Sequence, residues 1–589
     1  ELHLLLSLGP HPSYDEVWGI LGPSLTDWRT NPKLATIVLS GLAKNRLPRL
    51  AGRVLQLMLG NRAEVNVFHC SAAISACEKA NEWQLALSFL RDMPEFEVIP
   101  NHISYNACIS ACEKGGQWQH ALGLLITMPE VSLIPNVINY SVCITACGKG
   151  GQWQLALCLL SGLPRVSLIP NVVSCSACIS ACEKGQQWQC ALSLLSDMPE
   201  LRVVPNEISY NAAISACEKA SRWQNALELL SDMVVVGLTP DEISYNAAIS
   251  ACTNGGRWQH ALRLLCHMPG SRLTPNEISY SAAISACEKG LQWHLALRLL
   301  GSMPGLRMGP NEVSCSAAIS ACEKGFWWQT ALDLLTSMPA MSVMPNSISY
   351  SACISACAKG KHWQMAADLL DKMPRRHLLP SEITCNAAIC ACAIGGQWQL
   401  AVSLLSSMSS IRLAPNAVSY SSAISAAEKA LEWQLALSLL SSMTVVKLAA
   451  NLITYSAAIS ACGGGSQWWI SLALLSTMPA VRIRPDEISH NAAITACERS
   501  SQWQLAVSLL RQLPAQRLLP SQISFQDTVA SCMKCKLWQR AFELLGEMLS
   551  LSIEQSDASI SSVLLAECEQ RGLLGSETGL LVVLGHASC

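Results

Sequence analysis

Two positions that recur every 35 residues carry side chains able to form several hydrogen bonds. The first alternates between Ser and Asn: Ser71, Asn106, Ser141, Ser176, Asn211, Asn246, Ser281, Ser316, Ser351, Asn386, Ser421, Ser456 and Asn491. The second follows 30 residues later and holds an amide, a carboxylate or a hydroxyl: Asn101, Asn136, Asn171, Asn206, Asp241, Asn276, Asn311, Asn346, Ser381, Asn416, Asn451, Asp486 and Ser521. A Ser or Asn beside a carboxylate or an amide presents different sets of donors and acceptors. Such pairs predict a series of sites that tell ligands apart by hydrogen bonding.

A simpler interpretation exists for the second position. Asn, Asp and Ser are the residues preferred immediately before a helix, so this position would look much the same in a helical protein that binds other proteins. Capping does not explain why Ser and Asn alternate at the first position while the rest of the repeat is nearly copied.

The repeat itself is marked by Trp and Pro. Trp recurs at intervals of 35 residues, at Trp83, Trp118, Trp153, Trp188, Trp223, Trp258, Trp293, Trp328, Trp363, Trp398, Trp433, Trp468, Trp503 and Trp538. Pro keeps the same interval from Pro100 to Pro415 and again at Pro485 and Pro520, with Ala450 as the exception. A fixed period of 20 to 50 residues is typical of solenoids, propellers and arrays.

The spacing of apolar residues predicts two helices in each repeat. In the unit 207–241, Tyr210, Ala213, Ile214 and Cys217 form one apolar stripe of a helix over 207–219, because they are spaced at i, i+3, i+4 and i+7. A second helix begins near Trp223. In other units a Gly-Gly pair closes the first helix, and a Pro after Met ends the second. Such short hairpins must stack to bury their apolar stripes, which predicts an all-α solenoid and excludes a propeller.

The organisation of the chain follows from the range of this pattern. We expect an N-terminal extension at 1–31, a degenerate capping repeat at 32–66, thirteen tandem repeats at 67–521, a degenerate repeat at 522–556 and a C-terminal cap and tail at 557–589. The chain begins with Glu rather than Met, so its natural start can lie further upstream and a targeting peptide cannot be assessed.

Composition narrows the classes of function. Half of the 589 residues are hydrophobic, yet no apolar run approaches the roughly 18 residues of a membrane span. The net charge of −2 gives no overall attraction to nucleic acid. Thirteen of the 28 cysteines occupy one place on the apolar stripe, from Cys77 to Cys532. Stacked helices lie roughly 9–10 Å apart, too far for disulfides, so these cysteines are expected to be small core residues.

Two further rows share the polar face of the first helix. A β-branched residue lies two places after the helix-capping position: Ile103, Ile138, Val173, Ile208, Ile243, Ile278, Val313, Ile348, Ile383, Val418, Ile453 and Ile488. A cation recurs near the end of the same helix: Lys79, Lys114, Lys149, Lys184, Lys219, Lys289, Lys324, Lys359, Lys429 and Arg499. A solvated helix end, where cations favour the helix dipole, explains the second row equally well.

These features together resemble the pentatricopeptide repeat family. The resemblance rests on a 35-residue helical hairpin that ends in Pro-Asn or Pro-Asp and is followed by a β-branched residue, a Tyr and a Ser or Asn, and it covers about residues 32–556. The Trp-Gln that opens the second helix departs from the family, which commonly carries aliphatic and acidic residues there. A tetratricopeptide repeat is disfavoured, because its period is 34 residues and its Trp lies in the first helix.

The resemblance implies a right-handed superhelix that binds single-stranded RNA, one base per repeat. The paired positions would read the base edge, the β-branched row would sandwich bases, and the cations would face phosphates. In the family's scheme, Ser with Asn favours adenine, Asn with Asp uracil, Asn with Asn a pyrimidine, Ser with Asp guanine and Asn with Ser cytosine. The predicted site then reads 5′-A-Y-A-A-U-Y-A-A-N-Y-A-G-C, where Y is a pyrimidine and N marks the unassigned pair Ser351 and Ser381.

We expect a monomer that acts post-transcriptionally in a mitochondrion or plastid, possesses no catalytic site and needs no cofactor. RNA-processing proteins are further expected partners. Cys532 and Cys535 form a CxxC without a second pair or a His nearby, so no metal site is expected. A scaffold that binds protein partners is the alternative function.

Overall fold

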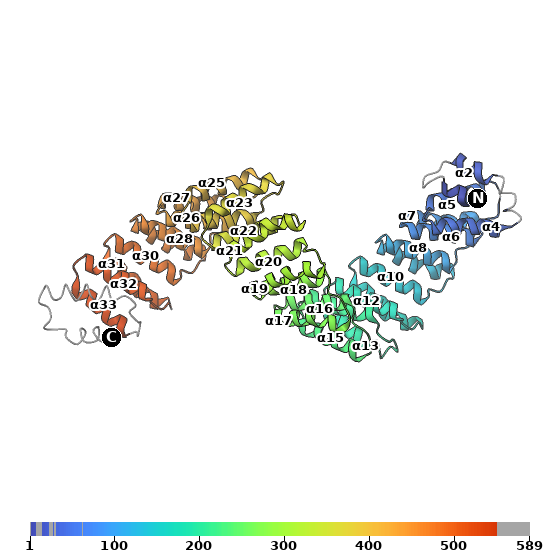
Figure 1. Ribbon diagram of the computed structural model, residues 1–589, viewed down its shortest axis with the longest axis horizontal. Coiled ribbons are helices and arrows are strands. Elements are labelled where there is room, and N and C mark those ends of the chain that lie inside the picture. The colour runs from blue at the N-terminus through green and yellow to red at the C-terminus, as the bar shows by residue number, and fades with distance from the viewer. Residues whose placement is uncertain are drawn as a thin grey trace. The chain divides into compact units, whose positions relative to one another are not determined.

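The computed structural model describes residues 2–7, 14–22, 28, 31–61, 63–516 and 518–550, and the regular elements in these residues are all helices (Figure 1). The chain divides into two compact units, residues 1–290 and 291–589. Each unit is a tandem series of helix pairs, in which a helix A is followed by a helix B. The predicted all-α solenoid of helical hairpins is therefore confirmed. The cap and tail predicted at 557–589 lie outside the described residues.

The A helices of the first unit are α4 (Pro32–Lys44), α6 (Val67–Ala80), α8 (His102–Lys114), α10 (Val137–Lys149), α12 (Val172–Lys184), α14 (Glu207–Lys219), α16 (Glu242–Asn254) and α18 (Glu277–Lys289). Its B helices are α5 (Pro48–Gly60), α7 (Trp83–Asp92), α9 (Trp118–Thr127), α11 (Trp153–Gly162), α13 (Trp188–Asp197), α15 (Trp223–Val235) and α17 (Trp258–His267). Two short helices, α1 (Leu2–Ser7) and α2 (Tyr14–Leu21), pack against α4 and α5.

The A helices of the second unit are α20 (Glu312–Lys324), α22 (Ser347–Lys359), α24 (Glu382–Ile394), α26 (Ala417–Lys429), α28 (Leu452–Gly464), α30 (Glu487–Arg499) and α32 (Gln522–Lys534). Its B helices are α19 (Trp293–Ser302), α21 (Trp328–Ser337), α23 (Trp363–Arg375), α25 (Trp398–Ser410), α27 (Trp433–Val445), α29 (Trp468–Thr477), α31 (Trp503–Ala515) and α33 (Trp538–Ser550). Within each unit, successive A helices pack on one another, and each B helix contacts the A helices on either side of it.

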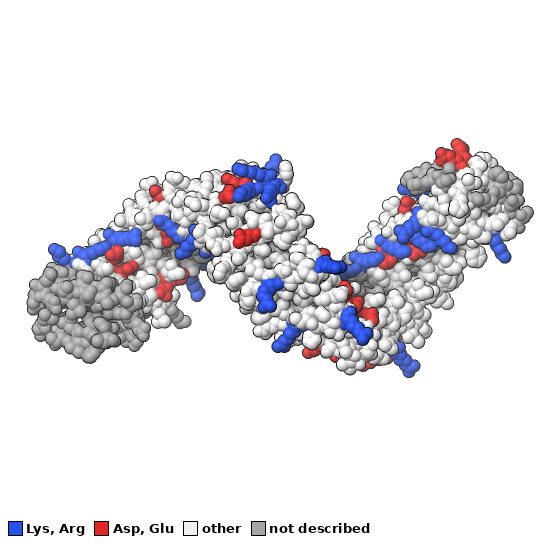
Figure 2. Space-filling view, viewed as in Figure 1, with Lys and Arg blue, Asp and Glu red and all other residues white. Residues whose placement is uncertain are grey.

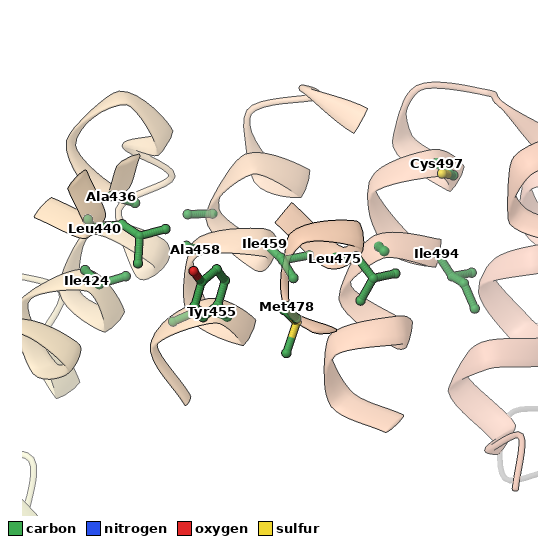
Figure 3. Close-up of a cluster of buried hydrophobic side chains, with 14 of the residues drawn as sticks. Ile424, Ala436, Leu440, Tyr455, Ala458, Ile459, Leu475, Met478, Ile494 and Cys497 are labelled. Atoms are coloured by element: carbon green, nitrogen blue, oxygen red, sulfur yellow. The ribbon is translucent and has the colours of Figure 1, made fainter. Parts of the chain in front are cut away.

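In the second unit, one cluster of buried apolar side chains continues from repeat to repeat, from Cys385 to Met548. Figure 3 shows this for neighbouring repeats of the second unit, where Ile459 of α28, Leu475 of α29 and Ile494 of α30 point into the same layer. All three side chains are buried. No repeat encloses a core of its own there, so each one depends on its neighbours for stability.

The recurrent cysteines lie in this core, as the sequence predicts. Cys77, Cys217 and Cys497 are fully buried, and every described cysteine is a free thiol. Burial raises the pKa of the Cys77 thiol to about 12 and that of Cys217 to about 11. These thiols are therefore protonated at neutral pH and serve as small apolar residues.

Proline sets the length of helix B in most repeats. Where Pro follows Met, as in Met128-Pro129, the α-helix stops early and a 3₁₀ turn follows; where it is absent, as in α15, the helix is three residues longer. The 3₁₀ turns are η1 (Met93–Phe96), η2 (Met128–Val131), η3 (Leu163–Val166), η4 (Pro269–Ser271), η5 (Pro304–Leu306), η6 (Met338–Met341) and η7 (Pro479–Val481).

The prediction that this Pro ends helix B is wrong in two repeats, because Pro374 and Pro514 lie inside the last turns of α23 and α31. Each helix ends one residue after its Pro, where only a terminal hydrogen bond is lost.

The glycines after helix A have two separate roles. The second Gly of a Gly-Gly pair, such as Gly116 with φ +70°, adopts the left-handed conformation expected of it. The glycine one place earlier packs against the Trp of the preceding helix B, also in repeats that lack the second glycine. At Gly185, which Gln186 follows, an added Cβ would lie 2.4 Å from Cδ1 of Trp153. This close approach links the Trp period to the end of the next A helix, a contact that the sequence alone does not reveal.

We expect Gly185→Val to lower the free energy of unfolding by about 1–3 kcal/mol, because overpacking forces Trp153 from its position. Gly123→Val is the matched control: Gly123 lies within α9, and nothing lies within 4 Å of an added Cβ. This control should be near neutral, since Val has a slightly better helix propensity than Gly. Denaturant unfolding of the two variants measures the difference, and equal stability would contradict the packing role.

Candidate functional site

A row of exposed apolar side chains follows the A helices of both units. All twelve predicted β-branched residues are exposed, from 53% for Val418 to 73% for Ile383, whereas the apolar stripe of the same helices is buried. Single exposed apolar residues are common, but the same exposed residue type in successive repeats marks an interaction surface.

The two hydrogen-bonding positions lie beside this row, and direct contacts join seven of the twelve predicted pairs that lie within one unit. The amide of Asn211 donates to both carboxylate oxygens of Asp241 at 3.2 Å, and Asn491 donates to Ser521 Oγ at 3.0 Å. Longer contacts of 3.4–3.5 Å join Ser141–Asn171, Ser176–Asn206, Asn246–Asn276, Ser316–Asn346 and Asn386–Asn416. The two residues of each such pair are 30 positions apart in the sequence, and they meet where one repeat contacts the next.

The remaining described pairs are held differently. In three pairs an intermediate side chain forms hydrogen bonds with both members. Ser104 joins Ser71 to Asn101, and Asn139 joins Asn106 to Asn136. Thr384 joins Ser351 to Ser381. Ser421 and Ser456 instead donate to carbonyl oxygens of their own helices, at 2.9 and 3.0 Å. The structure therefore does not join these two to Asn451 and Asp486.

Helix capping and side-chain pairing coexist at the second position. Asp241 Oδ1 accepts a hydrogen bond from the backbone amide of Ser244 at 2.8 Å and lies 2.8 Å from Ser244 Oγ, while Asp241 Oδ2 accepts from Asn211. Burial alone would raise the pKa of Asp241, but the hydrogen bonds from Ser244 and Asn211 outweigh it and lower the pKa. The carboxylate is thus ionised at neutral pH and acts only as an acceptor.

A third set of polar residues positions the pairs, and our sequence analysis did not identify it. These side chains are fully buried at the third residue of each A helix from α6 to α32: His69, Ser104, Asn139, Ser174, Ser209, Ser244, Ser279, Ser314, Ser349, Thr384, Ser419, Thr454, Ser489 and Ser524. Ser244 Oγ donates to Asn211 Oδ1 at 2.5 Å, so the amide nitrogen of Asn211 faces Asp241. The recurrence of Ser three residues after each cap was the available signal.

Serines at the first position are less open than the sequence predicts. Ser71, Ser141, Ser176, Ser281, Ser316 and Ser421 are only 4–9% exposed. The hydroxyls of Ser141, Ser176 and Ser281 turn back to carbonyl oxygens four residues earlier in their own helices. Asn at the same position, as at Asn211 and Asn246, is half-buried because its longer side chain reaches further out.

Several of the lysines near the ends of the A helices form ion pairs with glutamates. Ion pairs of 2.6–3.1 Å join Lys114–Glu78, Lys149–Glu113, Lys219–Glu183 and Lys359–Glu323, each glutamate coming from the preceding repeat. Figure 2 shows such blue and red side chains lying next to one another. Lys184 and Lys429 form no ion pair among the described residues, because Gly148 and Ala393 replace the glutamate.

Other kinds of site find no support in the described residues. These hold no group of three or more His, Cys, Asp or Glu side chains arranged to bind a metal ion. Over the same part of the chain, no helix has the length and apolarity to cross a membrane.

Comparison with known proteins identifies the repeat. The PPR repeat family model matches residues 205–254, 240–289 and 345–394, and the pentatricopeptide repeat domain model matches 53–117, 159–220 and 403–465. A further PPR repeat model matches 103–132 and 383–413. Together the matches span more than half of the chain. Among curated proteins, none matches the sequence.

Solved structures agree with the fold. The crystal structure of the pentatricopeptide repeat protein PPR10 from maize is 21% identical with a TM-score of 0.52, over 94% of this chain and 80% of that one. PPR10 in complex with an 18-nt psaJ RNA element is 19% identical with a TM-score of 0.58, over 99% of this chain and 90% of that one. From its repeat models, its tandem helix pairs and this likeness, the chain belongs to the pentatricopeptide repeat family.

Proposed function

We propose that this protein binds single-stranded RNA in a sequence-specific manner and acts in the processing, stability or translation of transcripts. Each base would lie between β-branched side chains of successive repeats, such as Ile208 and Ile243. Its edge would meet one hydrogen-bonding pair, such as Asn211 and Asp241. The RNA-bound structure of PPR10, which has the same fold, supports this choice of ligand.

One observation carries the proposal: an exposed β-branched residue accompanies a polar pair whose chemistry changes among nearly identical repeats. Asn206 and Asp241 both cap their helices, so capping alone does not require the change from amide to carboxylate. A surface that reads different bases does require it, because Watson–Crick edges differ in their donors and acceptors.

A gel-shift experiment tests the proposal against the scaffold alternative. The full chain is titrated into labelled single-stranded RNA with the sequence A-Y-A-A-U-Y-A-A-N-Y-A-G-C and into a scrambled RNA of the same composition. Binding that favours the first RNA supports the proposal. Absence of RNA binding, together with a stable protein partner, would favour the scaffold.

The ion pairs predict which lysines contribute to affinity. We expect Lys184→Ala to weaken binding of all RNA sequences alike, because its charge is not neutralised by a glutamate. The slope of log affinity against log salt should become shallower by about one unit. Fluorescence anisotropy at several salt concentrations measures both quantities.

The matched control is the double variant Glu183→Ala/Lys219→Ala, which removes a complete ion pair and leaves the net charge unchanged. Its affinity and salt slope should stay close to the original values. If Lys184→Ala weakens only one RNA sequence, or if both variants behave alike, contact between Lys184 and phosphate is excluded.

Family membership also leads us to propose a mitochondrial or plastid location. Imaging of the natural full-length protein with a C-terminal fluorescent tag tests this, and a diffuse cytosolic signal would contradict it.

A further inference from the structure

Several A helices begin with a glutamate that contacts the cap of the next repeat. Glu242 Oε2 accepts a hydrogen bond from the amide of Asn276 at 3.0 Å. Glu312 and Glu382 accept from Asn346 and Asn416 in the same way. Because the carboxylate holds an amide of the polar pair, it lies beside the face that would read a base.

The bonds around Asn276 fix the order of the polar groups. Asn246 Oδ1 accepts from Ser279 Oγ at 2.6 Å, which leaves its amide nitrogen to donate to Asn276 Oδ1 at 3.4 Å. The amide nitrogen of Asn276 donates one hydrogen to Glu242. A second hydrogen remains on each amide nitrogen. The order is therefore donor from Asn246, donor from Asn276 and acceptor from Glu242.

The second unit repeats this arrangement with the same residue types. Ser419 Oγ donates to Asn386 Oδ1 at 2.6 Å, Asn386 donates to Asn416 Oδ1 at 3.4 Å, and Asn416 donates to Glu382. A third Asn-Asn pair, Asn106 and Asn136, has His102 at the corresponding place. The chain therefore contains two pairs with the carboxylate and one natural control without it.

A donor, donor, acceptor order matches one base. The Watson–Crick edge of cytosine presents, in order, the acceptors O2 and N3 and the amino donor N4, whereas uracil presents acceptor, donor, acceptor. A carboxylate is also the usual acceptor for cytosine N4 in direct readout. We propose that Glu242 and Glu382 are third base-reading residues, which narrow the pyrimidine preference of their Asn-Asn pairs to cytosine at the sixth and tenth bases. This inference rests on the proposed RNA-binding function.

The test compares RNAs that differ only in C or U at the sixth base. We expect the unmodified protein to prefer C by roughly tenfold, within the range of a good side-chain contact to a base. Glu242→Val should abolish this preference while pyrimidines remain favoured over purines. Val is a suitable replacement because Val137 and Val172 occupy the same place in other repeats.

The natural control extends the test to the second base. There the unmodified protein should bind C and U alike, and His102→Glu should create a preference for C. If Glu242→Val binds the C and U RNAs more tightly by the same factor, the carboxylate acts only by repelling the RNA, and the inference is overturned. An unchanged C-to-U ratio would overturn it as well. Failure of the unmodified protein to bind any RNA would instead refute the proposed function.

Discussion

We expect the exchange of Asn211 for Ser and of Asp241 for Asn together to change the preferred fifth base from uracil to adenine. The Asp241 carboxylate is an ionised acceptor suited to the N3–H of uracil, and the exchange replaces it with an amide that can donate. The expected change in discrimination is roughly 1–3 kcal/mol, as for other direct contacts to base edges. Binding of RNAs with each of the four bases at the fifth position measures it.

Folding should not change in this double variant. The neighbouring repeat already combines Ser176 with Asn206, and Asn206 caps its helix by accepting from the amide of Ser209 at 2.9 Å. Thermal unfolding of the variant should therefore match that of the original chain. If both proteins prefer the same fifth base, or neither has a preference, Asn211 and Asp241 serve only as capping and surface residues.

Removing repeats one at a time should lower the denaturant midpoint in steps. Each interface between repeats buries side chains such as Ile459, Leu475 and Met478, and each of these contributes about 1.5–3 kcal/mol before the opposing loss of chain entropy. Because stability in such arrays is a sum of repeat and nearest-neighbour terms, a chain of three repeats should unfold at a much lower denaturant concentration than one of twelve.

Circular dichroism of each shortened chain provides the control, since the helical signal per residue in the absence of denaturant shows whether the remaining repeats are folded. Equal midpoints for three and twelve repeats would contradict a nearest-neighbour array. A single unfolding transition would also contradict it if its midpoint were the same whichever repeat carried a destabilising substitution equivalent to Gly185→Val.

The sequence predicts the architecture well because the same spacing of apolar and helix-capping residues recurs in each repeat. The apolar stripe represented by Tyr210, Ala213 and Cys217 is buried, and the capping role of Asn206 is confirmed. The exposure of Ile208 and its counterparts also follows from the helical period, since these residues lie opposite that stripe. Pro374 and Pro514 escape the pattern because the last turn of a helix tolerates a proline.

Contacts between repeats are where prediction from the sequence stops. The pairing of Lys219 with Glu183, the seating of Gly185 on Trp153 and the bond between Ser244 and Asn211 each join residues about one repeat apart. Helical periodicity within one repeat gives no information about such distances. They depend on how closely neighbouring A helices approach, which only the packed structure shows.

Selection from a pool of randomised RNA tests the central claim most directly. The full chain is incubated with the pool, the bound molecules are sequenced, and the enriched motif is aligned with the repeats. We predict a motif containing A-Y-A-A-U-Y-A-A-N-Y-A-G-C, with the N-terminal repeat at its 5′ end. Retention of RNA without an enriched motif, or enrichment of a motif unrelated to the order of the Ser and Asn pairs, would contradict sequence-specific reading by these residues.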